Sequence, residues 1–251
     1  MRIAVYSDLH CGHINAIAPT LHQVSEDSHG CWKLFKKFNR KYGPFDAVLI
    51  LGDVIDGKAG RNGGVELVTT DQSKQADIAI QVLDQVPVKK GAKWYQVGGT
   101  PYHGGMSEDF ERLVASSFGA EYGAVVWPEI GGVRFRMRHK INRAMNNLNK
   151  QIGIHQRRLG SGREKQADCM LFGHLHTYAQ RQEACNGKPM YAISCPALQG
   201  VTDFGSRQCD GDVDIGCLAI DVEKGSIASI HEHITPLGVD TWGTAKSLGL
   251  L

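Results

Sequence analysis

Residues 46–56 read DAVLILGDVID, an apolar run followed at once by a glycine and two aspartates. A continuous apolar run of this length is typical of a strand that is buried on both faces. A second short run, at residues 2–7, leads in the same way into Asp8 and His10. In α/β sheets, ligands bind beyond the carboxyl ends of the strands. We therefore expect the polar residues after these two strands to lie close together.

On both sides of this stretch, the pattern of apolar and polar residues predicts strands that alternate with helices, which indicates an α/β fold. Further strands are predicted at 93–97, 133–138 and 169–172, and helices at 31–41, 72–84, 108–118 and 141–159. From residue 187 onward most signals are strands, and those at 216–222 and 226–231 are predicted to form a hairpin. Since no linker rich in proline, serine or charge divides the chain, we expect one domain over residues 1–251.

Composition excludes several classes of protein. Of the 251 residues, 42% are hydrophobic and 22% are charged, as in ordinary globular proteins. No apolar run approaches the roughly 18 residues of a membrane span, and the polar start of the chain is unlike a signal peptide. The seven cysteines contain no C-x-x-C pair, which favours reduced thiols. We expect a cytoplasmic protein that does not enter a membrane, with no evident protein partner.

Metal-type ligands follow five of the expected strands. In an extended segment, residues two apart face the same side, so Asp8 and His10 can contact one ion. The other candidates are Asp53, the segment GGTPYH at 98–103, His139, and the pair His174 and His176. Carboxylate and imidazole donors without thiolate suit manganese, iron, zinc or nickel better than calcium or magnesium.

The order of these motifs resembles that of the calcineurin-like metallophosphoesterases, whose signature is D-x-H, G-D-x-x-D, G-N-H-(D/E), a single His and G-H-x-H. The resemblance implies a four-layer sandwich of two mixed β-sheets flanked by helices. It also implies two divalent ions, for which we expect manganese, with iron, zinc or nickel as alternatives. One ion would be held by Asp8, His10, Asp53 and His176, and the other by Asp53, His139 and His174, with Asp53 and a hydroxide bridging the two.

The third motif departs from the family pattern. Thr100 stands where an asparagine ligand is expected, and two extra residues precede His103. Thr100 could bind the second ion directly or through water. His103 is the best match for the histidine that protonates the leaving group. Asp56 is expected to support the ligands rather than bind metal, and His155, the rival of His139, is expected inside a helix.

A basic segment lies between the last two metal motifs. Residues 134–165 carry a net charge of +9. The helix expected at 141–159 would present Arg143, Lys150 and Arg157 on one face, which could hold a polyanionic substrate. The alternative is a solvated helix face. Arg61, in the glycine-rich loop at 57–64, could also reach a phosphate.

Three functions remain open from the sequence. The first is a metal-dependent phosphodiesterase or nuclease, and the basic segment favours nucleic acid as its substrate. The second is a phosphomonoesterase that acts on nucleotides or phosphoproteins. The protein phosphatases of the family carry an arginine directly after G-D-x-x-D, where this chain has Gly57, which weakens the phosphoprotein alternative. The third is a metal-binding scaffold without activity.

Overall fold

Two mixed β-sheets form the centre of the structure, a computed structural model that describes residues 1–58, 63–104, 109–141, 148–185, 187–203 and 212–237. The first sheet has the strand order β11-β10-β1-β2-β3-β4 and the second has β5-β6-β7-β9-β8. Parallel and antiparallel pairs occur in both sheets. The expected fold, two mixed sheets with flanking helices, is therefore confirmed.

The strands of the first sheet are β1 (Arg2–Tyr6), β2 (Phe45–Ile50), β3 (Val88–Val97), β4 (Glu121–Gly123), β10 (Val213–Glu223) and β11 (Ser226–Leu237). Those of the second are β5 (Glu129–Ile130), β6 (Val133–Arg138), β7 (Cys169–Phe172), β8 (Ala179–Cys185) and β9 (Lys188–Ser194). The helices are α1 (Glu26–Tyr42), α2 (Gln72–Leu83), α3 (Pro101–Gly104), α4 (Phe110–Ser117) and α5 (Leu148–Gly160), with a 3-10 helix at Thr20–His22.

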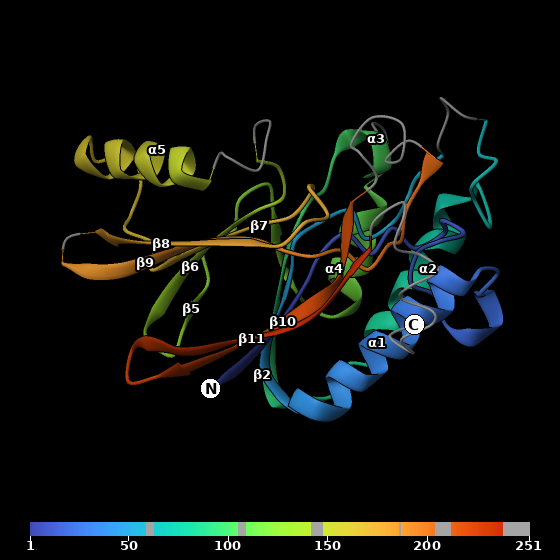
Figure 1. Cartoon of the computed structure of the whole chain (residues 1–251), viewed down its shortest axis with the longest axis horizontal. Helices are drawn as coiled ribbons and strands as arrows, with labels where there is room; N and C mark the ends of the chain where they lie inside the picture. Colours follow the sequence, from blue (N-terminus) through green and yellow to red (C-terminus); the bar gives the residue numbers. More distant parts are fainter. Residues whose placement is uncertain (59–62, 105–108, 142–147, 186, 204–211, 238–251) are drawn as a thin grey trace.

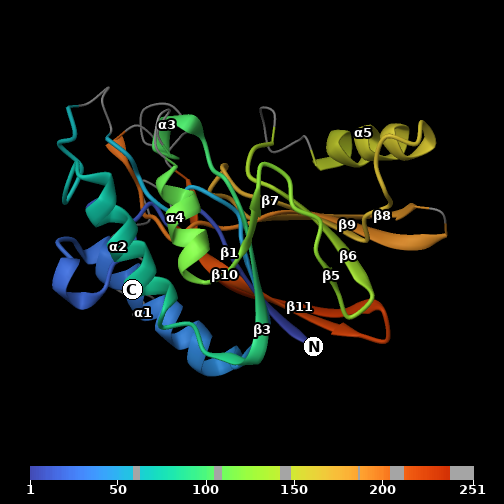
Figure 2. The ribbon, with the colours of Figure 1, turned by 180° about the vertical axis from the view of Figure 1, so that it is seen from behind.

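Successive side chains of a strand point to opposite faces of its sheet, so each sheet packs against helices on one face and against the other sheet on the other. In β1, Ala4 packs toward the helices, whereas Ile3 packs toward the second sheet. In β7, Leu171 faces the first sheet and Phe172 faces α5. Figures 1 and 2 show α1 and α2 on one side of the paired sheets and α5 on the other. Because both sheets are covered on both faces, their central strands are the continuous apolar runs seen in the sequence.

The parallel strands bring the motifs to one edge. In the first sheet β1, β2 and β3 run parallel, and in the second β6 runs parallel to β7. Each of these five strands ends at a motif: Asp8, Asp53, Gly98, His139 and Gly173 follow directly or within three residues. The topology therefore gathers residues that are far apart in the chain.

Several local predictions need correction. The first helix is longer than expected, since it begins at Glu26, where the Ser25 hydroxyl accepts the Ser28 N–H at 3.1 Å. Of the helix expected at 141–159, the described residues contain Leu148–Gly160 as α5, and residues 142–147 lie outside the described part of the chain. The helix expected at 108–118 begins at Phe110, because Asp109 caps it by accepting the Arg112 N–H at 3.0 Å. By contrast, α2 begins directly after its predicted cap, Asp71.

Candidate metal centre

The predicted ligands adopt an unusual backbone conformation. Among the described residues, six non-glycine residues have positive φ: Asp8, His10, Asp53, His174, His176 and Lys224. Five of the six are predicted metal ligands. A left-handed conformation costs a residue other than glycine about 1–3 kcal/mol, and such strain concentrates at functional sites. The fold holds these side chains in directions that a relaxed backbone would not give them.

Hydrogen bonds between the loops that follow β1, β2 and β7 maintain this conformation. The pairing of β1 with β2 continues past the strand ends, where Asp8 N–H donates to Gly52 O at 3.1 Å and His10 N–H donates to Asp53 O at 2.9 Å. Across the sheets, His174 N–H donates to the Asp8 carboxylate at 3.0 Å. The loops after β1, β2 and β7 are therefore one connected unit.

Three groups of side chains are spaced as metal ligands, with donor atoms within 4.8 Å of one another. The groups are Asp8, His10 and His176; Asp53, His139 and His174; and His10, Asp53 and His103. Asp53 belongs to two of the groups. Because it also contacts residues of both sheets, Asp53 occupies the position of a shared ligand. The predicted ligands are thus brought together, and their roles in binding metal stay predictions.

His139 shows how well the residues fit a cation. Its Nδ1–H donates to Leu51 O at 2.6 Å, so the neutral ring keeps its lone pair on Nε2. This buried Nε2 has no hydrogen-bond partner among the described residues, although Asp53 Oδ2 lies 2.9 Å away. An imidazole nitrogen and a carboxylate oxygen placed side by side, without an aligned hydrogen bond, are arranged as two ligands of one ion.

Asp53 and His139 shift each other's pKa. Burial would raise the pKa of Asp53, but the facing His139 imidazolium lowers it well below the usual value. Burial likewise lowers the pKa of His139, yet the Asp53 charge outweighs it and raises that pKa to about 10. Burial lowers the pKa of His174 to about 4, so this ring is neutral near pH 7. A cation entering the site would replace the proton on His139, since ligating imidazoles must be neutral.

Thr100 contacts the Asp53 carboxylate through two donors. Its N–H donates to Asp53 Oδ1 at 2.6 Å, and its hydroxyl donates to the same oxygen at 3.2 Å. The close approach depends on Gly99, because a Cβ at that position would collide with Asp53 Oδ1 and the Asp53 nitrogen. In this arrangement Thr100 orients the shared carboxylate, and its role as a direct ligand stays a prediction.

His103 faces the centre from α3. Its Nδ1–H donates to Asp56 O at 2.6 Å, which leaves Nε2 3.9 Å from Asp53 Oδ2. Burial and then the charge of His10 lower the pKa of His103. With 20% of its side chain exposed, the ring is open to solvent on one side. The ring is therefore close to the predicted metal ligands and accessible from solvent, and its role toward the leaving oxygen stays a prediction.

Asp56 supports the ligands, as the sequence predicts. Its Oδ1 accepts the His10 Nδ1–H at 2.9 Å, which fixes the tautomer of His10 and directs Nε2 inward. The His10 Nε2 then lies 3.2 Å from His176 Nε2. Asp56 thus holds the two histidines, His10 through its side chain and His103 through its carbonyl.

Glu111 is a supporting residue that the sequence analysis missed. Buried on α4, it accepts the Val54 N–H at 3.1 Å and the Gly99 N–H at 2.6 Å. It therefore ties the loop after β2 to the loop after β3. Burial, followed by the charge of Asp53, raises the pKa of Glu111 to about 8. The only sequence signal is an acidic residue on the apolar side of an amphipathic helix, which by itself indicates no role.

The basic residues lie apart from this centre or outside the described part of the chain. Arg61 and Arg143 are outside the described residues. Lys150 and Arg157 are exposed on α5, which packs on β8 and β9, and both views show α5 well separated from α3. The roles predicted for these four residues in binding substrate stay predictions.

Part of the basic segment is neutralised by its one acid, Glu164. This carboxylate contacts Arg136 at 3.2 Å, Arg158 at 2.7 Å and His155 at 2.9 Å. Arg136 is 4% exposed and lies over the Trp127 ring, 5.5 Å from its centroid. The network fastens α5 to the second sheet. It also explains His155, which lies within α5 as expected and not at the metal centre.

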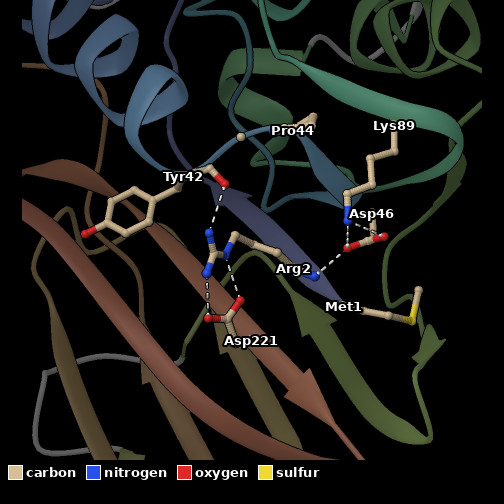
Figure 3. A pocket seen from close by; sticks show the side chains of 8 residues that line it. Met1, Arg2, Tyr42, Pro44, Asp46, Lys89 and Asp221 are labelled. Atoms are coloured by element: carbon tan, nitrogen blue, oxygen red, sulfur yellow. Dashed lines mark hydrogen bonds and ion pairs between the residues drawn. The ribbon is translucent and has the colours of Figure 1, made fainter.

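A second concave region lies at the opposite end of β1 (Figure 3). This pocket, of about 360 Å³, is lined by charged residues that pair with one another. Arg2 Nε donates to Asp221 at 2.7 Å, and Lys89 Nζ contacts Asp46 at 2.9 Å. Because the acids and bases drawn there already neutralise each other, we assign this pocket a structural role.

The sequence match agrees with the geometry. Residues 1–99 match the family model described as calcineurin-like phosphoesterase. The resemblance recognised in the motifs is thereby confirmed over residues 1–99. The matched part contains Asp8, His10 and Asp53. No curated protein sequence matches the chain significantly.

Solved structures with a similar fold include Vps29 from Entamoeba histolytica in complex with Zn²⁺, at 14% identity and TM-score 0.49, covering 95% of this chain and 99% of that chain. An archaeal phosphodiesterase matches at 15% identity and TM-score 0.46, covering 94% and 100%. A metallophosphoesterase from Sphaerobacter thermophilus matches at 12% identity and TM-score 0.45, covering 100% and 95%. Likenesses this distant carry no functional argument, so the resemblance to the family rests on the sequence match over residues 1–99. Separately, none of the helices in the described ranges is both long and apolar enough to cross a membrane.

Proposed function

We propose that the chain is a metal-dependent phosphoester hydrolase with two adjacent cation sites, and that its substrate is a phosphodiester. The observation that carries the proposal is Asp53. This buried carboxylate is grouped with His139 and His174 on one side and with His10, a member of the Asp8–His10–His176 group, on the other. The facing His139 Nε2 is buried without a hydrogen-bond partner among the described residues. A pair of donor sets that share one carboxylate is the arrangement that two-metal phosphoesterases require.

The chain's own residues suggest a division of roles. Asp8, His10 and His176 would hold one cation, His139 and His174 the other, and Asp53 both, with manganese as the expected metal. When bound, such cations neutralise the phosphoester and lower the pKa of an attacking water. Thr100 orients the Asp53 carboxylate through its N–H and hydroxyl. His103, fixed by Asp56, would stabilise or protonate the departing oxygen.

The leaving-group role of His103 provides the first test. We expect His103→Ala to reduce hydrolysis of phosphodiesters with alkyl leaving groups by roughly 10²–10⁴-fold. Hydrolysis of bis-p-nitrophenyl phosphate should fall much less, because p-nitrophenolate departs without a proton. The measurement is kcat/KM with manganese for both substrates, with His29→Ala, an exposed histidine on α1, as the matched control. Equal losses on both substrates would show that His103 does not act on the leaving group.

Substrate class requires a panel of substrates. We propose that nucleic acid is the natural phosphodiester, supported by the exposed Lys150 and Arg157 on α5 and by the net charge of +9 over residues 134–165. The panel contains bis-p-nitrophenyl phosphate, p-nitrophenyl phosphate and single-stranded and double-stranded oligonucleotides, each with manganese. A preference for p-nitrophenyl phosphate would indicate a phosphomonoesterase. Inactivity on every substrate, with metal bound, would indicate a scaffold.

A further inference from the structure

The second half of α1 carries positive charges that the proposed mechanism does not use. Residues 33–41 read KLFKKFNRK, with five cations and no acid, and the acids of α1, Glu26 and Asp27, lie in its first turn. With about 3.6 residues per turn, the five cations share one face of the helix, opposite the buried Phe35 and Phe38. All five are exposed, and together they are called the basic row: Lys33, Lys36, Lys37, Arg40 and Lys41.

The charges of the basic row are not neutralised by acids. Among the described residues, none of the five forms an ion pair with a carboxylate. Lys36 Nζ donates to the neutral Gln85 Oε1 at 3.2 Å and lies 5.5 Å from the centroid of the Trp32 ring. Lys41 Nζ lies 4.9 Å from the centroid of the Tyr42 ring. Because these partners are neutral, the row keeps its full positive charge at the surface.

Such a row is unfavourable for the helix by itself. Like charges four residues apart destabilise an isolated helix. Three pairs of this kind occur in the row, namely Lys33 with Lys37, Lys36 with Arg40, and Lys37 with Lys41. A helix face that is merely solvated usually alternates cations with acids, and no acid interrupts this row. A polyanion lying along the helix would offset the repulsion.

The basic row lies at the end of the first sheet that is remote from the metal centre. α1 ends at Tyr42, β2 begins three residues later at Phe45, and Asp53 follows the far end of β2. Figures 1 and 2 show the end of α1 and the helix α3, which carries His103, on opposite sides of the molecule. The row is therefore a surface separate from the proposed catalytic centre.

The character of this surface favours nucleic acid over a protein or a membrane. The exposed large hydrophobic residues of the described part include none from α1, whereas the cores of protein interfaces are apolar and depleted in lysine. The apolar face of α1 is buried against the first sheet, so it is not available to enter a bilayer. Four residues of helix advance by about 6 Å, so successive cations of the row can contact neighbouring phosphates of one strand.

We infer that the basic row binds the phosphate backbone of a nucleic acid. The inference goes beyond the proposed function, because this binding needs neither metal nor turnover. The contacts are to phosphates, which carry no sequence information, so binding should be independent of sequence. A nucleic acid must extend from one end of the first sheet to the other to contact both the row and the metal centre, so the row would favour long substrates over short ones.

The test measures binding of a labelled single-stranded oligonucleotide by fluorescence anisotropy over a range of salt concentrations, in EDTA to prevent hydrolysis. Each phosphate contact contributes about 0.7 to the slope of log K against log salt for a single strand. Lys33→Ala/Lys37→Ala should therefore flatten the slope by about 1.4 and weaken binding at about 50 mM salt by roughly 10- to 100-fold. Lys33→Arg/Lys37→Arg should retain the wild-type slope, because both charges remain.

The matched control is Lys74→Ala/Lys188→Ala, which removes two exposed lysines from α2 and β9 and changes the net charge equally. It should keep the wild-type slope, and urea unfolding should show that Lys33→Ala/Lys37→Ala is no less stable than the wild type. If the wild type does not bind at low salt, or if both alanine pairs lose binding equally, the surface is excluded. Equal competition by polyglutamate, or tighter binding to phosphatidylserine vesicles, would overturn the assignment to nucleic acid. Because EDTA is present, none of these outcomes bears on the metal centre.

Discussion

At the scale of single residues, Gly99 shows how tightly the shared carboxylate is enclosed. A Cβ on Gly99 would collide with Asp53 Oδ1 and lie 2.8 Å from Asp53 Cα. Gly99→Ala must therefore displace Asp53 or the loop after β3. We expect a loss of bound manganese, at least a 100-fold fall in kcat/KM, and destabilisation of about 1–3 kcal/mol from overpacking. Metal content by mass spectrometry and urea unfolding measure these effects.

The control for this substitution is Gly153→Ala on α5, where a Cβ would have nothing within 4 Å. In the interior of a helix, alanine is favoured over glycine by about 0.5–1 kcal/mol. Gly153→Ala should therefore raise the free energy of unfolding and keep the full metal content. Full metal content in Gly99→Ala as well would contradict the enclosed geometry of Asp53.

Asp27 is not one of the predicted metal ligands, and its ionisation is expected to make the stability of the fold depend on pH. This buried residue in the first turn of α1 has one carboxylate oxygen, Oδ1, without a hydrogen-bond partner among the described residues. Burial, followed by the charge of Glu26, raises the pKa of Asp27 to about 7. Between about pH 4 and 7 the folded chain then holds a proton that the unfolded chain has released. Stability should therefore decrease as pH rises through this range.

Asp27→Asn removes the titrating group and should flatten this pH dependence. The variant should be more stable than the wild type at pH 8 by about 1 kcal/mol, because a buried charge without a partner is removed. Urea unfolding at pH 5 and pH 8 provides the measurement, and Asp77→Asn, exposed on α2, is the control. An equal pH dependence in the wild type and Asp27→Asn would show that Asp27 ionises normally.

At the scale of secondary-structure elements, α4 acts as a clamp through Glu111. Its carboxylate accepts the N–H groups of Val54 and Gly99 and so joins the loops after β2 and β3. Glu111→Ala leaves both donors without a partner, at about 1–3 kcal/mol for each buried group. We expect a loss of about 2–4 kcal/mol in unfolding free energy and weaker metal binding. Glu111→Gln, which keeps one acceptor, should be intermediate.

Unfolding curves and manganese titrations of the two Glu111 variants test this clamp. Glu121→Ala removes an exposed glutamate on β4 and should change neither property. If Glu111→Ala loses stability but binds manganese with unchanged affinity, the clamp supports the fold without positioning the ligands.

The elements that sequence predicts are those whose burial leaves a continuous signal. β2 and β7 are covered on both faces, so DAVLIL and CMLF are recognisable as strands, and the ligands behind them follow from the direction of the chain. β8 has the sequence AQRQEAC and lies at a sheet edge with most of its residues exposed, so no apolar run marks it. Sequence periodicity therefore reports burial, and an exposed edge strand such as β8 is missed.

The same reasoning explains which site residues were found. Asp8, His10, His174 and His176 occur in short motifs because each pair lies on one loop. Glu111 escapes detection because its partners are backbone N–H groups of Val54 and Gly99, and a backbone group leaves no trace in the sequence. The apolar spacing from Ile141 to Leu159 predicted one helix, and the described part of it, α5, contains the apolar residues Leu148, Ile152 and Leu159 of that spacing.

At the scale of the whole molecule, the metal centre lies where the two sheets meet. Asp8, His10 and Asp53 follow strands of the first sheet, whereas His139, His174 and His176 follow strands of the second. Cations held between these residues would bind the folded chain and not the unfolded one, since the ligands are far apart in sequence. Metal binding should therefore stabilise the association of the two sheets along with the site.

This coupling predicts a large effect of metal on thermal unfolding. A ligand present at a thousand times its Kd stabilises the folded state by about 4 kcal/mol. For a chain of this size, each kcal/mol raises Tm by roughly 2–4 °C. Manganese at that excess should therefore raise Tm by roughly 8–16 °C over the protein in EDTA, as measured by calorimetry. Asp53→Asn should lose at least half of the increase because Asp53 belongs to two of the three groups, whereas His29→Ala should keep it. The same increase in Asp53→Asn would mean that manganese binds elsewhere, and the shared-carboxylate site would have to be abandoned.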